Sequence, residues 1–86
     1  MHTVELLEHA LAVAERLGYR IRQDWLDGST GGACLIGNQK WIFLDLTLGP
    51  LDHLTCVAEA IRGEPGLANL DLPPELRSLV DVRKSA

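Results

Sequence analysis

A histidine and a cysteine stand three positions apart at His53 and Cys56. On a helix this spacing places the imidazole and the thiol on adjacent turns of one side, where both could bind one metal ion. A complete site needs one or two more ligands, and the candidate donors are Cys34, His2, His9 and Glu59. Because cysteine is also one of the most frequently buried residue types, we expect both cysteines to be structural and no metal or cofactor to be bound. A metal- or thiol-dependent site at Cys34, His53 and Cys56 is the alternative.

Two further patterns that could support catalysis lack the residues that they need. The glycine-rich stretch 27–32 has no lysine followed by serine or threonine, so it predicts a tight turn rather than a phosphate-binding loop. Asp45 lies in an apolar strand pattern, where a carboxylate either accepts hydrogen bonds from nearby backbone or marks a site, and we favour the backbone role. We therefore expect that the protein is not an enzyme.

The length and charge of the chain restrict the remaining classes. Its 86 residues allow one hydrophobic core, and a domain of this size gains stability from burial against a partner. The net charge of −4 disfavours nucleic acid and anionic membranes as partners. No apolar run approaches the roughly 18 to 20 residues of a membrane span, and the N-terminus lacks the basic start of a signal peptide. We expect a cytoplasmic protein with reduced thiols.

Hydrophobic periodicity predicts an α+β fold: a helix, a three-stranded antiparallel meander, a second helix and a short C-terminal helix. Thr3 is the expected cap of the first helix and Gly18 its end, while Gly37–Asn38 suits a tight hairpin turn. Pro50 suits the first turn of the second helix. The expected elements are helices at 3–17, 50–62 and from 73 onward, and strands at 19–25, 33–36 and 40–46.

The chain divides into two parts. Residues 1–63 form the expected α-β-β-β-α core domain, because Gly63 ends the second helix and a linker follows it. Residues 64–86 form an apolar tail with a short helix, whose apolar side chains run from Leu67 to Val82. We expect the tail to pack on the sheet of its own chain or on a second copy.

The strand at 40–46 is apolar on both faces. Trp41 and Phe43 share one face while Ile42 and Leu44 share the other, a pattern that is typical of a central strand. Two helices cover only one face of a three-stranded sheet. The second face therefore needs a cover, which could be the tail, a second copy or a different protein.

From this uncovered face we expect a non-catalytic protein-interaction module that forms a homodimer or binds another protein. Large aromatic side chains contribute much of the energy of packed interfaces. RNA binding through the basic residues between Arg16 and Lys40 is a weaker alternative, because the chain as a whole is acidic. The expected interaction surface consists of Trp25, Trp41, Phe43, Leu72, Leu76 and Leu79.

Three segments, Leu17–Ile21, Gly31–Cys34 and Trp41–Asp45, resemble an uncharacterised family of small bacterial domains. The similarity covers roughly two thirds of the chain. It implies a small bacterial domain and supplies no function.

The order of a strand, a small-residue turn, an apolar strand and a helix is also similar to the core of ImmA/IrrE-type zinc peptidases, whose helix carries His-Glu-x-x-His. In the matching segment, Glu59 stands in the place of the general-base glutamate, and Ala58 and Arg62 replace the two zinc ligands. Loss of both ligands removes the Lewis acid and the activated water together. This resemblance implies a degenerate, zinc-peptidase-like pseudo-enzyme.

Overall fold

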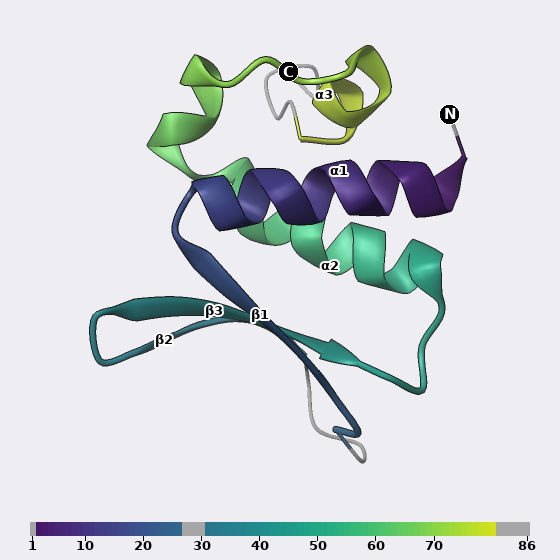
Figure 1. Cartoon of the computed structure of the whole chain (residues 1–86), viewed down its shortest axis with the longest axis vertical. Coiled ribbons are helices and arrows are strands. Elements are labelled where there is room, and N and C mark those ends of the chain that lie inside the picture. The colour runs from purple at the N-terminus through teal and green to yellow at the C-terminus, as the bar shows by residue number, and fades with distance from the viewer. Residues whose placement is uncertain (1, 27–30, 81–86) are drawn as a thin grey trace.

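The computed structural model of the chain describes residues 2–26 and 31–80, in which three α-helices lie on one side of a three-stranded sheet (Figure 1). This arrangement confirms the predicted α+β class. The elements follow one another as α1 (Thr3–Arg16), β1 (Tyr19–Asp24), β2 (Gly32–Ile36), β3 (Gln39–Asp45), α2 (Pro50–Arg62), the 3-10 helix η1 (Pro65–Asn69) and α3 (Pro74–Val80).

The sheet is mixed, with the strand order β1-β3-β2. β2 and β3 form an antiparallel hairpin, and Gly37 takes a φ of 61° in its turn, as the Gly37–Asn38 pair predicts. β1 pairs with the other edge of β3 and runs parallel to it, so the predicted antiparallel meander is wrong. A meander would leave β3 at an edge, whereas its apolar side chains on both faces favour the centre that it occupies.

The helix ends follow local sequence closely. His2, rather than the expected Thr3, is the N-cap of α1, and its backbone N–H donates to the Glu5 carboxylate over 3.4 Å. Pro50 lies in the first turn of α2, and Gly63 is the C-cap of that helix. The predicted start and end of α2 are therefore confirmed.

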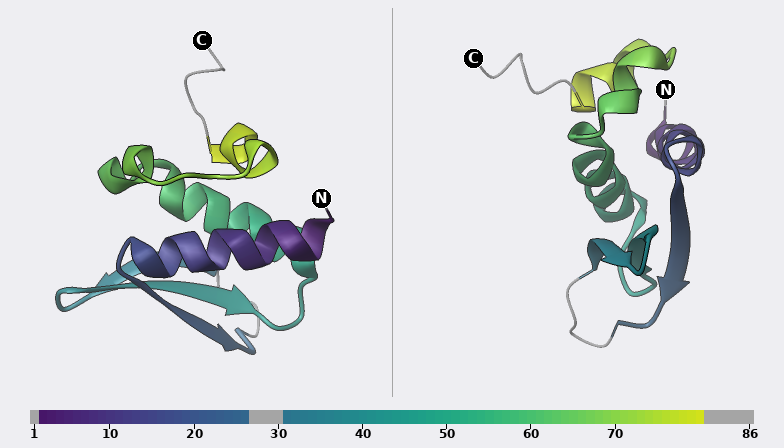
Figure 2. Two further views of the ribbon diagram at one scale, coloured as in Figure 1. Left: turned by 45° about the horizontal axis from the view of Figure 1, so that its top comes forward. Right: turned by 90° about the vertical axis from the view of Figure 1, so that its left-hand side faces the viewer.

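A single core lies between the sheet and the helices α1 and α2 and continues between these two helices and α3. Ile42 and Leu44 of β3 are buried beneath α1 and α2, which cover one face of the sheet (Figure 2). Apolar stripes of the two helices complete this layer, as their spacing predicts. The other core residues are Ala10, Val13, Ala14, Tyr19, Leu54, Val57, Ala58, Ile61, Leu72, Leu76 and Val80.

The C-terminal segment packs on the helices and not on the sheet. α3 contacts α1 and α2, and Figure 2 shows it on the far side of these helices from the strands. Leu72 and Leu76 are buried there, so the expectation that the tail covers the second face of the sheet is wrong for the described part of the tail. The physical reason is that Leu72, Leu76 and Val80 belong to the same apolar cluster as the buried side chains of α1 and α2. Val82 lies outside the described residues.

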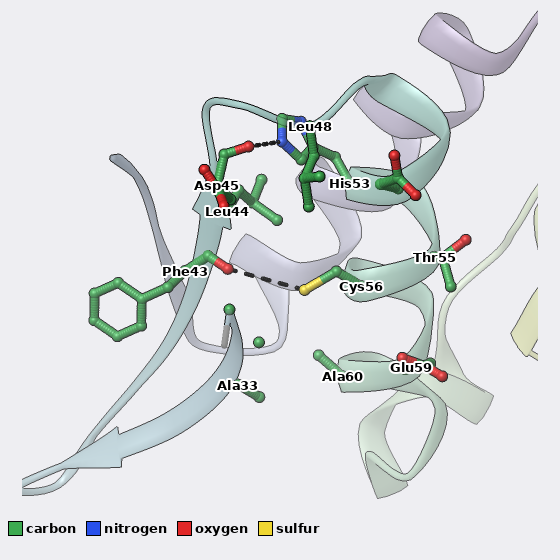
Figure 3. A pocket seen from close by; sticks show the side chains of 13 residues that line it. Ala33, Phe43, Leu44, Asp45, Leu48, His53, Thr55, Cys56, Glu59 and Ala60 are labelled. Carbon is green, nitrogen blue, oxygen red and sulfur yellow. Dashed lines mark hydrogen bonds between the residues drawn. The ribbon is translucent and has the colours of Figure 1, made fainter. Parts of the chain in front are cut away.

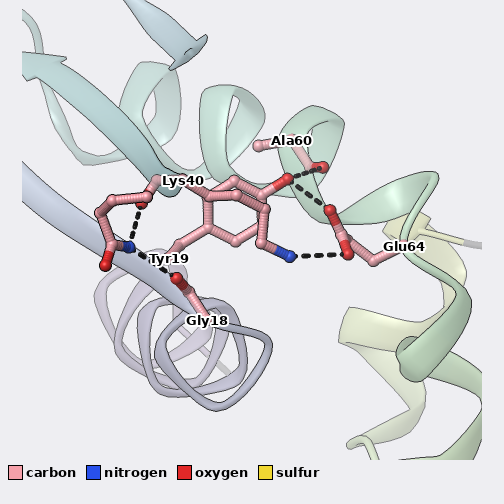
Figure 4. Close-up of polar contacts among 6 residues, drawn as sticks. Gly18, Tyr19, Lys40, Ala60 and Glu64 are labelled. Carbon is pink, nitrogen blue, oxygen red and sulfur yellow. Dashed lines mark hydrogen bonds and ion pairs between the residues drawn. The ribbon is translucent and has the colours of Figure 1, made fainter. Parts of the chain in front are cut away.

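A polar cluster fastens the start of the sheet to the end of α2 (Figure 4). The hydroxyl of Tyr19 donates to Glu64 Oε2 over 2.7 Å, with the carbonyl of Ala60 at 3.2 Å as a second acceptor. Lys40 Nζ lies 2.9 Å from Glu64 Oε1 and 4.7 Å from the centroid of the Tyr19 ring. Burial, followed by the hydrogen bond and the charge of Glu64, raises the pKa of Tyr19 to about 12.

Replacing the tyrosine tests this cluster. Tyr19→Phe is expected to lower the free energy of unfolding by about 1 kcal/mol at neutral pH, because the hydrogen bond to Glu64 is lost. The folded-state pKa of Tyr19 lies above the ordinary value of 10.0, so the wild-type advantage is complete below pH 10 and disappears as the pH rises towards 12. Denaturant unfolding of both proteins measures this difference, and tyrosinate absorbance follows the only tyrosine directly. An ordinary tyrosine titration in the folded protein would contradict the cluster.

Candidate functional site

A groove separates α2 from the edge strand β2 (Figure 3). Its cavity has a volume of about 560 Å³, within the range of small-ligand pockets. The backbone of Gly31 and Gly32 lines one wall, and His53, Cys56 and Glu59 of α2 line the other. The structure thus brings His53 and Cys56 to one groove, as their helical spacing predicts.

His53 and Cys56 are both held by backbone carbonyl groups of β3. His53 Nε2 lies 2.6 Å from the carbonyl oxygen of Asp45, and a carbonyl only accepts, so this nitrogen carries the proton. The thiol of Cys56 donates to the carbonyl of Phe43, with a sulfur–oxygen distance of 3.9 Å. Burial, and then the nearby charge of Glu59, raises the pKa of the Cys56 thiol. A raised pKa disfavours the thiolate, which is the form that attacks electrophiles and binds metals.

Cys34 lies apart from this groove. In the β2–β3 ladder it is paired with Trp41, so its side chain emerges on the face of the sheet that carries Trp41 and not on the face that α2 covers. The sheet therefore separates Cys34 from Cys56. Within residues 2–26 and 31–80, no three or more His, Cys, Asp or Glu side chains are grouped so that they could hold a metal ion.

Asp45 ends β3 and holds the turn that follows. Its Oδ1 accepts a hydrogen bond from the backbone N–H of Thr47 over 2.9 Å, which confirms the predicted backbone role. This hydrogen bond is the main reason why the pKa of Asp45 lies below its ordinary value. This turn also brings the carbonyl oxygen of Asp45 within hydrogen-bonding distance of His53 Nε2.

The segment that resembles the zinc-peptidase helix lies in α2. Glu59 lines the groove, while Ala58 is buried in the core. Arg62 donates from Nη2 to the carbonyl of Leu79 over 2.7 Å, and this bond joins α2 to α3. Ala58 and Arg62 thus have packing and hydrogen-bonding partners within the chain.

The second candidate region is the face of the sheet opposite to α1 and α2, here called the open face, which consists of Arg20, Arg22, Cys34, Trp41 and Phe43. The strand register places these side chains together, and Figure 3 shows the Phe43 ring pointing away from α2. None of the helices in the described part of the chain packs on it (Figure 2).

The open face carries an ordered stack of side chains. The rings of Trp41 and Phe43 lie 5.9 Å apart between centroids at an interplanar angle of 17°. The guanidinium carbon of Arg20 lies 5.8 Å from the centroid of the Trp41 ring, a cation–π distance. Arg22 forms an ion pair with Asp24, the next residue but one of β1, with a nitrogen–oxygen distance of 3.5 Å.

The predicted interaction residues separate into three groups. Trp41 and Phe43 form the stack on the open face, and Trp25 is 67% exposed just after β1. Leu72 and Leu76 are core residues and cannot contact a partner in the folded chain, whereas Leu79 remains partly exposed. Alternation along 19–25 predicts Arg20 and Arg22 on one face of the strand, but it does not predict the stacking of Arg20 on Trp41, which depends on the pairing of β1 with β3.

Within the described ranges, no helix combines the length and the apolar character that crossing a membrane requires. Comparison of the chain with protein-family models, with curated proteins and with solved structures gave no match.

Proposed function

We propose that the protein is a non-catalytic protein-interaction module that binds its partner through the open face. The observation that carries this proposal is the Arg20–Trp41–Phe43 stack, which lies on a face that no described helix covers. Aromatic residues and arginine are the residue types that most often dominate binding energy. A cytoplasmic location, in which both thiols stay reduced, belongs to the same proposal.

The stack is suited to binding because its side chains are already ordered. Trp41 and Phe43 support each other, so less rotamer freedom is lost when a partner covers them. Arg20 and Arg22 favour a partner surface that combines apolar side chains with carboxylates. The contact is thus expected to be partly apolar and partly electrostatic.

The groove supports this choice over thiol chemistry. The pKa of Cys56 is raised, and the sheet lies between Cys56 and Cys34. Neither condition favours a thiolate nucleophile or a shared metal site. A binding role for the open face needs neither cysteine to react.

Site-specific photocrosslinking tests the proposed function. A photoreactive residue at Arg22, on the open face, is expected to give a discrete protein adduct in cells that express the chain. The same residue at Glu8, on the exposed side of α1, is the matched control. The adduct should disappear when Trp41→Ala is added. Equal adducts from both positions, or an adduct that ribonuclease removes, would overturn the proposal.

Trp41→Ala and Ile42→Ala form a matched pair on opposite faces of β3. Trp41 is only half-buried, so its replacement should lower the free energy of unfolding by no more than about 2 kcal/mol. Ile42 is fully buried, and its replacement should cost more, about 2 to 5 kcal/mol. Chemical denaturation of the two variants gives both values. A larger loss for Trp41→Ala would place that side chain in the core instead of on a binding surface.

A further inference from the structure

The two edges of the sheet differ in how they are protected. β1, at one edge, carries Arg20, Arg22 and Asp24, and charges of this kind discourage pairing with another strand. β2, at the other edge, runs Gly-Ala-Cys-Leu-Ile and has no charged residue and no proline. Of the two edges, β2 is therefore the one that presents an unguarded template for a further strand.

Apolar side chains on this strand are left in solvent. Leu35 is 67% exposed and Ile36 is 55% exposed. The β2–β3 hairpin projects past the ends of α1 and α2, so the helices do not shield it (Figure 1). A further strand beside β2 would cover part of this apolar surface and leave the core unchanged.

The hairpin fixes which backbone groups point outwards. A two-residue turn is closed by a hydrogen-bonded pair, here Ile36 with Gln39, and hydrogen-bonded pairs alternate with open ones along an antiparallel ladder. Cys34 and Gly32 therefore direct their backbone groups to β3. Ala33 and Leu35 direct their N–H and C=O groups to the free edge.

We propose that β2 pairs antiparallel with β2 of a second copy, about a two-fold axis at Cys34. In this register Ala33 of each copy exchanges backbone hydrogen bonds with Leu35 of the other, and it is the register that pairs the whole of β2 with itself. Cys34 then faces its own counterpart in a non-hydrogen-bonded pair, where side chains approach most closely. A second copy is the fitting occupant because the strand is uncharged and its outward groups are self-complementary.

The pairing would join two sheets into one and extend the open face. Both copies of the Trp41–Phe43 stack would then lie on the same side of a continuous sheet, because a two-fold axis normal to the sheet keeps each face on its own side. The strand-edge contact is small, so the dimer belongs to the weak class of interfaces. This inference goes beyond the proposed function, since the edge can pair whether or not a partner covers the open face.

Charge pairing at position 34 tests the register. Sedimentation at up to millimolar concentration is expected to show a weak dimer of the wild-type chain. Cys34→Lys and Cys34→Glu should each weaken the dimer and raise its dissociation constant by about tenfold or more, because like charges then face each other across the axis. An equimolar mixture of the two variants should restore the dimer, as opposite charges meet. Because Cys34 is exposed, both variants are expected to keep their fold, and circular dichroism checks this.

Disulfide trapping gives a second measurement. In a Cys56→Ala background, diamide should take two electrons and two protons from the facing Cys34 thiols and yield a covalent dimer. Moving the thiol with Cys34→Ala and Ile36→Cys should abolish trapping, because position 36 faces Gly32 and lies about 13 Å along the strand from its counterpart.

A monomer at millimolar concentration, or a variant mixture that stays dissociated, would overturn the pairing. Trp41→Ala should remove partner adducts and leave this dimer intact, so the two proposals fail separately.

Discussion

Leu76→Ala is expected to lower the free energy of unfolding by about 2 to 5 kcal/mol, the range for a fully buried leucine. Leu76 is 0% exposed, and α3 packs against α1 and α2. Removing its side chain leaves a cavity between three helices, which can collapse only in part. Because small domains are stable by only several kcal/mol, the variant should be partly unfolded at moderate temperature. Denaturant unfolding with circular dichroism measures the change.

Leu79→Ala provides the control on the same helix. Leu79 is 39% exposed, so its replacement should cost less than about 1 kcal/mol. At micromolar concentration, where the weak β2 dimer is dissociated, the midpoint for Leu76→Ala should also be independent of protein concentration, since α3 packs on its own chain. Equal effects of the two substitutions, or a midpoint that rises within this concentration range, would mean that α3 does not pack as the structure shows.

The local parts of this fold could be predicted from the sequence. The spacing of apolar residues located both long helices, and Pro50 and Gly63 marked the start and end of α2. The Gly37–Asn38 turn and the central position of β3 follow from turn chemistry and from apolar side chains on both faces. These features depend on residues a few positions apart, which is the range that sequence patterns report.

The non-local parts could not be predicted. The choice between a meander and the order β1-β3-β2 depends on which edge of β3 receives β1, and alternation along β1 is the same in both cases. Leu72 and Leu76 have the spacing of a buried stripe, but a stripe does not say whether it packs on a sheet, on helices or on a partner.

In the candidate site, too, the local features could be predicted from the sequence and the non-local ones could not. His53 and Cys56 share a side of α2 because helical geometry requires it. The position of Cys34 depends on the β2–β3 register, which places its side chain beside Trp41 on the other face of the sheet. The contact between His53 and the carbonyl of Asp45 depends on the turn after β3, and no local pattern encodes it.

Gly31→Ala is expected to lower the free energy of unfolding by about 1 to 3 kcal/mol, as overpacking in a fixed environment does. A Cβ at this position would lie 2.8 Å from the backbone oxygen of Phe43 and 3.2 Å from Leu26 Cδ1. The oxygen belongs to the central strand, which has partners on both sides, so it is the added methyl and the start of β2 that must move.

Gly63→Ala is the matched control, because nothing lies within 4 Å of a Cβ there and its φ of −91° suits any residue. That substitution should be neutral or stabilise the fold by up to about 1 kcal/mol, since alanine restricts the unfolded chain.

Thiol labelling in a Cys34→Ala background adds a local measurement. Cys56 donates to the same Phe43 oxygen that the new methyl would crowd, so it should react faster in Gly31→Ala and at an unchanged rate in Gly63→Ala. Equal stability and equal labelling in the two variants would show that β2 does not approach β3 this closely, and the wall of the groove would then lie elsewhere.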